Sequence, residues 1–199
     1  MISPEASKEA LRKRLLSVRA GLTADDVTAA EAAVTRHALA LPELASARTV
    51  AAYVSVGREP GTRALLEELR ARGVRVLLPV LLPDNDLDWA VHRGPGTLAR
   101  ASRGLLEPTG ERLGPDAVLT ADTVLLPGLA VDRTGLRLGR GGGSYDRVLA
   151  RLDAAGAAPA LVVLLHDGEL LDRVPAEAHD RPVRAAVTPS GVHRFPAAG

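Results

Sequence analysis

Short runs of apolar, β-branched residues alternate along this chain with longer segments of helical character, and this alternation most narrows the possible folds. Residues 49–55 and 74–79 are runs of the first kind, and residues 62–72 have the spacing of a helix that Thr62 caps and Gly73 ends. Because both runs are apolar at nearly every position, they are typical of parallel strands covered on both faces. The pattern predicts an α/β fold, with a mostly parallel central sheet flanked by helices on both faces.

An N-terminal helical segment precedes the first of these strands. Ser3 is a candidate N-cap with Pro4 at the first helical position, so we expect a helix over residues 3–20. A second helix is expected over residues 23–41, with Thr23 at its start. The remaining expected elements are strands at 87–92 (antiparallel), 123–127, 160–165 and 185–188, a loop-rich stretch at 94–115, and a helix at 144–152.

Composition limits the class of protein further. The 199 residues suffice for one domain over 1–199, at about 150 residues per domain. Only Tyr53, Trp89, Tyr145 and Phe195 are aromatic, so Leu, Val and Ala must build the core. The absence of cysteine excludes disulfides and thiolate metal sites. A formal charge of +1 argues against nucleic-acid binding, and neither an export signal nor a membrane-spanning apolar run is found, so we expect a cytoplasmic protein.

The strongest chemical signal is the segment Arg137-Leu-Gly-Arg-Gly-Gly-Gly-Ser-Tyr-Asp146. Glycines allow backbone N–H groups to approach an anion closely, and the N-terminus of the following helix adds favourable partial charge. Arg137 and Arg140 would add fixed positive charge, and Asp146 is placed to hold Mg²⁺ against phosphates. A tight loop before a charged helix start would also explain the glycines, but the arginines and the aspartate favour phosphate binding. The segment lacks the lysine of a Walker loop, and it comes too late in the chain for a dinucleotide fingerprint.

The region from Pro127 to Arg147 resembles the signature of the 5-formyltetrahydrofolate cyclo-ligase family. That signature is a Pro-Gly, an aspartate, and then Arg-Leu-Gly-x-Gly-x-Gly-Tyr-Tyr-Asp. Here Gly142 replaces a frequent lysine and Ser144 replaces the first tyrosine, which removes a positive charge and an aromatic contact. Four more segments resemble family motifs in the family's order: Lys8-Glu-Ala-Leu-Arg12, Tyr53-Val-Ser-Val-Gly-Arg-Glu59, Gly104-Leu-Leu-Glu-Pro108 and Val174-Pro-Ala-Glu-Ala-His-Asp180.

This resemblance implies a fold of the NagB/RpiA/CoA transferase-like type and an ATP- and Mg²⁺-dependent enzyme. The implied reaction converts 5-formyltetrahydrofolate to 5,10-methenyltetrahydrofolate, with ADP and phosphate as the other products. A formamide oxygen is a poor leaving group, so phosphorylating it prepares the formyl carbon for intramolecular attack by N10. The implied partners are therefore 5-formyltetrahydrofolate and ATP, with no nucleic acid and no membrane, and we expect a monomer.

The resemblance also implies roles for individual residues. Arg137, Arg140 and Tyr145 would be catalytic, and Asp146 and Asp180 would bind Mg²⁺. The residues implied for ATP are Lys8, Arg12, Arg137, Leu138, Gly139, Arg140, Gly141, Gly142, Gly143, Ser144 and Tyr145. Those implied for the folate are Val54, Glu59, Arg140, Gly141, Gly142, Gly143 and Ser144.

Several of these residues have simpler explanations when taken singly. Lys8 and Arg12 could be solvated residues of an exposed helix, Glu59 a loop charge before a proline, and Asp180 a partner of a nearby arginine. Their occurrence together with Asp146 favours turnover. A folate- or nucleotide-binding relative without activity stays an alternative, whereas a sugar-phosphate isomerase or coenzyme A transferase would share only the fold.

Overall fold

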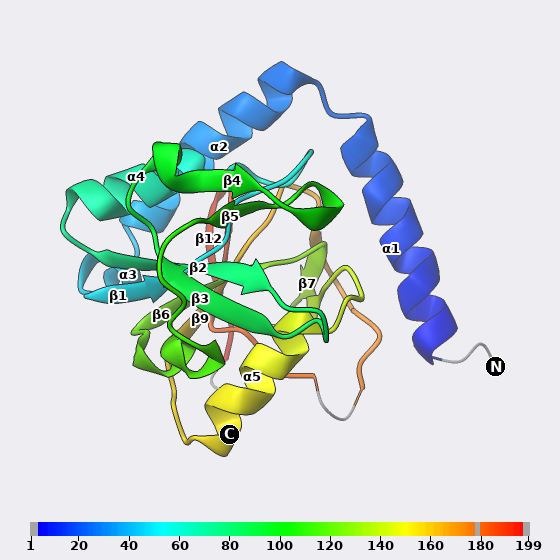
Figure 1. The fold of residues 1–199 in the computed structure, drawn as a ribbon. Helices are drawn as coiled ribbons and strands as arrows, with labels where there is room; N and C mark the ends of the chain where they lie inside the picture. The colour runs from blue at the N-terminus through cyan, green and yellow to red at the C-terminus, as the bar shows by residue number, and fades with distance from the viewer. Residues whose placement is uncertain (1–3, 178–179, 197–199) are drawn as a thin grey trace.

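The structure, a computed structural model, describes residues 4–177 and 180–196 (Figure 1). Its helices are α1 (Pro4–Ala20), α2 (Ala24–Leu39), α3 (Pro42–Ala45), α4 (Arg63–Ala71) and α5 (Ser144–Ala154), with short 3₁₀ turns at Pro95–Thr97, Ser102–Gly104 and Pro115–Thr120. Its strands are β1 (Thr49–Ala51), β2 (Arg75–Leu81), β3 (Leu87–Val91), β4 (Leu98–Arg100), β5 (Leu106–Pro108), β6 (Thr123–Pro127), β7 (Ala130–Asp132), β8 (Arg137–Leu138), β9 (Ala160–Leu164), β10 (Leu170–Leu171), β11 (Ala185–Thr188) and β12 (Gly191–Arg194). No helix in these ranges is both long enough and apolar enough to cross a lipid bilayer.

A seven-stranded sheet forms the centre, in the order β12-β11-β9-β6-β1-β2-β3. The five inner strands pair in parallel, and the edge strands β3 and β12 are antiparallel to their neighbours. This confirms the predicted α/β class and the antiparallel strand at residues 87–92. The sequence did not indicate β12, nor the small sheet β10-β7-β8, whose strands are too short for their periodicity to be recognised.

Apolar clusters fill both faces of the sheet. On one face, Val34 of α2 and Leu66 of α4 pack over the inner strands, and on the other face Val148 and Leu152 of α5 do so. Trp89 is completely buried in the second cluster, so it belongs to the core and does not face a ligand. Helix α1 lies to one side of the sheet, alongside β7 (Figure 1), where Leu15 packs in a third cluster.

Two predicted helix caps had different outcomes. At the start of α2, Thr23 and Asp26 form a reciprocal capping box, as expected from the sequence. Thr62 occupies the N-cap position of α4, as predicted, but its hydroxyl makes no capping hydrogen bond to the helix. It donates to the Tyr53 carbonyl at 2.8 Å and accepts from the Ser55 N–H at 2.9 Å. These bonds draw residues 53–55 toward α4, which explains why β1 ends earlier than predicted.

The predicted Ser3 cap lies outside the described residues. Two further differences concern the ends of elements. Pro42 does not only end the preceding segment but begins the short helix α3, at a first-turn position that suits proline. The stretch at 94–115 contains the hairpin β4-β5, and the Glu107 carboxylate fastens it to the central sheet by accepting from the Leu81 N–H at 2.9 Å.

Candidate active site

A cleft of about 440 Å³ opens beyond the carboxyl ends of β1 and β6. Parallel α/β sheets commonly bind ligands at this edge, because loops from several strands converge there. The residues that line it come from the segment after β1, from β2 and β3, from the β4-β5 hairpin, and from the glycine-rich loop with the start of α5. The fold therefore brings together segments that are widely separated in the sequence.

The glycine-rich loop joins β8 to α5 and forms one wall of this cleft. Gly141 and Gly143 have φ angles of +92° and +78°, a backbone region that favours glycine. Arg12 reaches the loop from α1, where its Nε donates to the Gly139 carbonyl at 2.9 Å. A Cβ atom at Gly141 would lie 3.3 Å from the Arg12 guanidinium, whereas a Cβ at Gly142 would meet open space. Arg12 thus supports the loop from behind.

Arg137 is the most confined charge in the cleft, with a side chain only 7% exposed. Its Nη1 donates to the Pro127 carbonyl at 2.9 Å, and its Nη2 lies 3.4 Å from Asp146. Its buried Nε has no hydrogen-bond partner among the described residues. Burial lowers the pKa of the Arg137 guanidinium, against the opposing charges of Asp146 and Asp180. A buried cation with an unused donor and one long ion pair attracts an anionic ligand.

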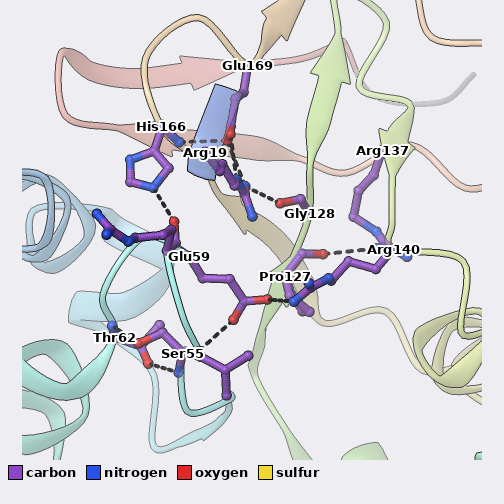
Figure 2. A network of polar contacts seen from close by, with 12 residues as sticks. Arg19, Ser55, Glu59, Thr62, Pro127, Gly128, Arg137, Arg140, His166 and Glu169 are labelled. Atoms are coloured by element: carbon purple, nitrogen blue, oxygen red, sulfur yellow. Dashed lines mark hydrogen bonds and ion pairs between the residues drawn. The ribbon is translucent and has the colours of Figure 1, made fainter. Parts of the chain in front are cut away.

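Glu59 lies across the cleft from Arg137 (Figure 2). It is buried, with one carboxylate oxygen accepting from the Val56 N–H at 2.9 Å and the other 3.3 Å from Arg140. Arg140 itself is exposed, so its guanidinium can turn toward a ligand. Tyr145 is partly buried nearby, and desolvation together with the Glu59 charge raises the pKa of its phenol well above the usual value. Its hydroxyl is therefore neutral and can donate a hydrogen bond.

Lys8 lies near the N-terminal end of α1, where it pairs with two carboxylates. Its Nζ is 2.5 Å from Glu177 and 2.8 Å from Asp180, and Asp180 also accepts from the Glu177 N–H at 2.7 Å. Burial lowers the pKa of Lys8, but the hydrogen bonds and charges of Asp180 and Glu177 outweigh it, so the pKa is raised overall. Lys8 is buried, unlike the solvated helix residue that its position alone suggested.

The structure gathers most of the predicted site residues but not all of them. Those that line the cleft are Val54, Glu59, Arg137, Gly139, Arg140, Gly141, Gly142, Gly143, Ser144, Tyr145 and Asp146. Those that do not line it are Lys8, Arg12, Leu138 and Asp180. The Leu138 side chain is buried in the third apolar cluster, so only its backbone could contact a ligand.

The two aspartates predicted to bind Mg²⁺ suit an ion that is held mainly by the phosphates of a bound substrate and by water. In the described ranges, no group of three His, Cys, Asp or Glu side chains is arranged to hold an ion. Asp146 is 52% exposed at the cleft, and its one ion pair within residues 4–177 and 180–196 is the long contact with Arg137, whereas Asp180 is engaged by Lys8. Mg²⁺ usually takes one or two carboxylates and completes its shell with phosphate and water. Asp146 fits this pattern.

Sequence reasoning missed part of the cleft. Arg103, with a positive φ of 57°, lines it from the β4-β5 hairpin, together with Leu106 and Glu107. Pro127 contributes the carbonyl that holds Arg137. The motif at residues 104–108 and the Pro-Gly pair were visible in the sequence, but neither pattern indicates which atoms face a ligand.

The comparisons with known proteins agree on one family. The model of the 5-formyltetrahydrofolate cyclo-ligase family matches residues 4–189. A protein of Mycolicibacterium smegmatis named 5-formyltetrahydrofolate cyclo-ligase is 44% identical over 92% of this chain and 94% of its own. The protein of that name from Escherichia coli K12 is 35% identical over 76% of this chain and 83% of its own.

The fold has solved counterparts as well. The NMR structure of Aquifex aeolicus 5,10-methenyltetrahydrofolate synthetase superposes with a TM-score of 0.80 and 28% identity, and the match covers 96% of this chain and 94% of that one. A family match over nearly the whole chain, with relatives above 30% identity, leaves one assignment. The chain belongs to the 5-formyltetrahydrofolate cyclo-ligase family and is an enzyme of this ligase class.

Proposed function

We propose that the chain uses ATP and Mg²⁺ to convert 5-formyltetrahydrofolate to 5,10-methenyltetrahydrofolate, releasing ADP and phosphate. The observation that carries this proposal is Arg137, a buried cation with an unused donor beside a glycine-rich loop. The family and the names of the relatives support the folate substrate and the ligase class. The ATP requirement, the ion and the residue roles are implied by the family resemblance, and the charges that line the cleft support them.

The glycine-rich loop would bind the triphosphate. Its backbone lies at the N-terminus of α5, where unpaired N–H groups and the helix dipole favour negative charge. Arg137 would contact a phosphate from within the cleft, and Arg140 would contact it from the side that is open to solvent. Arg12 would act indirectly, because it holds the Gly139 carbonyl and so fixes the loop.

The folate would bind between the loop and the segment after β1. Glu59 offers carboxylate oxygens, which can accept from the amino group and ring N–H of a pterin. Val54 and Leu106 provide apolar surface for the ring, and Tyr53 lies buried at the base of the cleft. Arg140, 3.3 Å from Glu59, would stand between the two substrates.

In the first step, the formyl oxygen would attack the γ-phosphorus and ADP would leave. In the second, N10 would attack the formyl carbon and lose its proton, and phosphate would depart with the former formyl oxygen. Both steps concentrate negative charge that Arg137 and Arg140 are placed to stabilise, and the neutral Tyr145 phenol can donate to a phosphate oxygen. Holding N10 near the formyl carbon makes the second step effectively unimolecular.

Asp146 would hold Mg²⁺, which neutralises phosphate charge when bound. Asp180 and Lys8 would join the site only if their ion pair at 2.8 Å opened toward the nucleotide. We further expect a cytoplasmic monomer, which cell fractionation and size-exclusion chromatography would test.

The direct test mixes the chain with 5-formyltetrahydrofolate, ATP and Mg²⁺ and follows the near-ultraviolet absorbance of the methenyl product together with ADP. We expect both products in equal amounts, and neither without folate. Absence of product above that of an Asp146→Ala control would refute the activity. Phosphate release without folate would indicate a plain ATPase, and binding of either substrate without turnover would indicate a non-catalytic relative.

A further inference from the structure

A buried polar network joins α1 to the loops behind the cleft (Figure 2). Arg19, near the end of α1, forms a two-pronged ion pair with Glu169, in which Nε and Nη2 lie 2.7 and 2.8 Å from the two carboxylate oxygens. The same Nη2 donates to the Gly128 carbonyl at 2.6 Å. Both side chains are almost fully buried, so the pair is shielded from solvent.

The network continues from Glu169 to the loop that carries Glu59. Glu169 accepts from the backbone N–H of His166 at 2.8 Å, and the His166 ring Nε2 lies 2.9 Å from the Arg58 carbonyl (Figure 2). Because a carbonyl oxygen can only accept, Nε2 must carry the hydrogen. His166 is itself buried, which leaves its ring little freedom to move.

Each end of this network is one residue away from a residue of the cleft. Arg58 directly precedes Glu59, whose carboxylate faces the cleft. Gly128 directly follows Pro127, whose carbonyl holds Arg137. Successive carbonyls at the end of β6 therefore accept from Arg137 and Arg19, so the network connects the proposed pterin acceptor to the proposed phosphate ligand.

The loop at residues 56–59 has few other restraints. It turns at Gly57, which has a φ of +59°, and it is closed by one backbone bond of 3.2 Å from the Glu59 N–H to the Val56 carbonyl. The Glu59 carboxylate then bonds back to the Val56 N–H. The His166 ring links the backbone of this loop to the loop after β9, and the exposed Arg140, 3.3 Å from the Glu59 carboxylate, reaches it from the glycine-rich loop.

We propose that His166 is a positioning residue, whose ring fixes the Arg58 carbonyl and thereby orients the Glu59 carboxylate for the folate. The Arg19–Glu169 pair fixes His166 in turn, through its backbone N–H. This inference rests on the proposed cyclo-ligase function. It adds a residue that touches neither substrate yet sets the affinity for one of them, and it predicts an effect on folate but not on ATP.

The test measures the Kd of 5-formyltetrahydrofolate by calorimetry without ATP, and the KM of each substrate in the methenyl assay. His166→Phe keeps the ring shape but removes the donor, so we expect the Kd and KM for the folate to rise about tenfold, or about 1.4 kcal/mol. The KM for ATP should change by less than about twofold. His166→Gln can place an amide N–H near the position of Nε2 and should restore most of the folate affinity.

A second comparison serves in case the phenylalanine variant folds poorly. The asparagine side chain is too short to reach Arg58, so His166→Asn should behave like His166→Phe while His166→Gln does not. His92→Phe is a matched control, because His92 is also buried and its Nε2 lies 2.6 Å from Glu67, away from the cleft. That control should lower the unfolding temperature without changing either KM.

A double-mutant cycle decides whether His166 acts through Glu59. In a Glu59→Gln background, His166→Phe should cost little further folate affinity, because the oriented carboxylate is already lost. Full additivity would overturn the proposal, as would an unchanged folate Kd or equal rises in both KM values. Wild-type chain that binds the folate but makes no methenyl product would refute the proposed function, and the Kd comparison would still test the role of His166 in folate binding.

Discussion

Two arginine–carboxylate clusters in this molecule use the same residue types in opposite ways. At the sheet edge, the Glu43 carboxylate bonds to Arg194 at 2.6 and 3.0 Å and to Arg184 at 3.2 Å, joining α3 to the ends of β11 and β12. In the cleft, Arg137 has a 3.4 Å contact with Asp146, and its Nε has no partner in the described part of the chain. The first cluster completes its own contacts, whereas in the described part of the second one buried donor lacks an acceptor.

This difference separates a structural cluster from a binding site better than charge alone. The hydrogen bond from Arg194 is the largest influence on Glu43 and lowers its pKa to about 2, as expected for a carboxylate whose ionised form is fully engaged. Burial lowers the pKa of Arg137, the sign of a cation that lacks sufficient counter-charge. A bound triphosphate would supply that charge, so the incomplete cluster is the one that should control activity.

The largest effect is expected from Arg137→Lys. Lysine keeps the positive charge but loses the planar fork that donates to the Pro127 carbonyl and would also reach a phosphate in the proposed complex. We expect kcat/KM to fall by about a hundredfold, within the range for removal of a donor that stabilises developing charge. The methenyl assay measures this, with Glu43→Gln as the control, which should change kcat/KM by less than about twofold. A similar loss in both variants would remove the distinction between the clusters.

The glycine-rich loop offers a matched pair of substitutions. Gly141→Ala introduces strain at a φ of +92° and a Cβ 3.3 Å from Arg12, whereas Gly142→Ala meets open space. A positive φ costs an L-residue about 1–2 kcal/mol, so we expect the KM for ATP to rise about tenfold in Gly141→Ala only. Steady-state kinetics with varied ATP check this. An equal effect of both alanines would mean that the shape of the loop does not control nucleotide binding.

The two predicted metal ligands differ in how much they are engaged, and this allows a third test. Asp146 is half-exposed at the cleft, whereas Asp180 is paired with Lys8. We expect Asp146→Asn to raise the Mg²⁺ concentration for half-maximal activity by about fivefold, as for loss of one carboxylate ligand. Asp180→Asn should mainly lower the melting temperature, because the buried Lys8 then loses the negative charge of a partner carboxylate. Mg²⁺ titrations and thermal melts separate the two, and a larger metal effect in Asp180→Asn would reverse the assignment.

The smallest effect concerns the completed cluster. The Glu43 pKa is about 2 in the folded chain against an ordinary 4.5, so the folded state binds fewer protons. The stability that this carboxylate contributes is therefore present above pH 4.5 and is lost as the pH falls toward 2. Since Arg184 and Arg194 are exposed and solvent screens their charges, we expect this contribution to the free energy of unfolding to be about 0.5–1 kcal/mol. Urea unfolding between these pH values should show that the free energy of unfolding falls less steeply with pH in Glu43→Gln than in the wild-type chain. Identical pH dependence in the two proteins would contradict the stabilising role of Glu43.

The sequence anticipated features that depend on neighbouring residues. Buried parallel strands are apolar throughout, so β6 and β11 were predicted with their observed limits, and the capping box of Thr23 follows from its spacing to Asp26. The glycine-rich loop was visible because its residues are contiguous. The strand β12 was missed because it alternates between half-buried and exposed residues over only four positions.

The rest of the site depends on contacts between distant residues. Arg19 and Glu169 are 150 positions apart, and neither occurs in a pattern that indicates burial. The ion pair between Lys8 and Asp180 was not predicted, because the family resemblance implied ATP for Lys8 and Mg²⁺ for Asp180, and the spacing of Lys8 alone favoured a solvated residue. The Thr62 hydroxyl formed tertiary bonds instead of the local cap, because the Tyr53 carbonyl and the Ser55 N–H lie within its reach.

The most direct test of the account is a calorimetric titration of MgATP into the wild-type chain, Arg137→Lys and Glu43→Gln. We predict that Arg137→Lys weakens binding by about tenfold or more, because the planar guanidinium of the cleft is lost, while Glu43→Gln binds as wild type does. Equal affinities for all three would contradict the claim that the incompletely paired charges of the cleft hold the triphosphate.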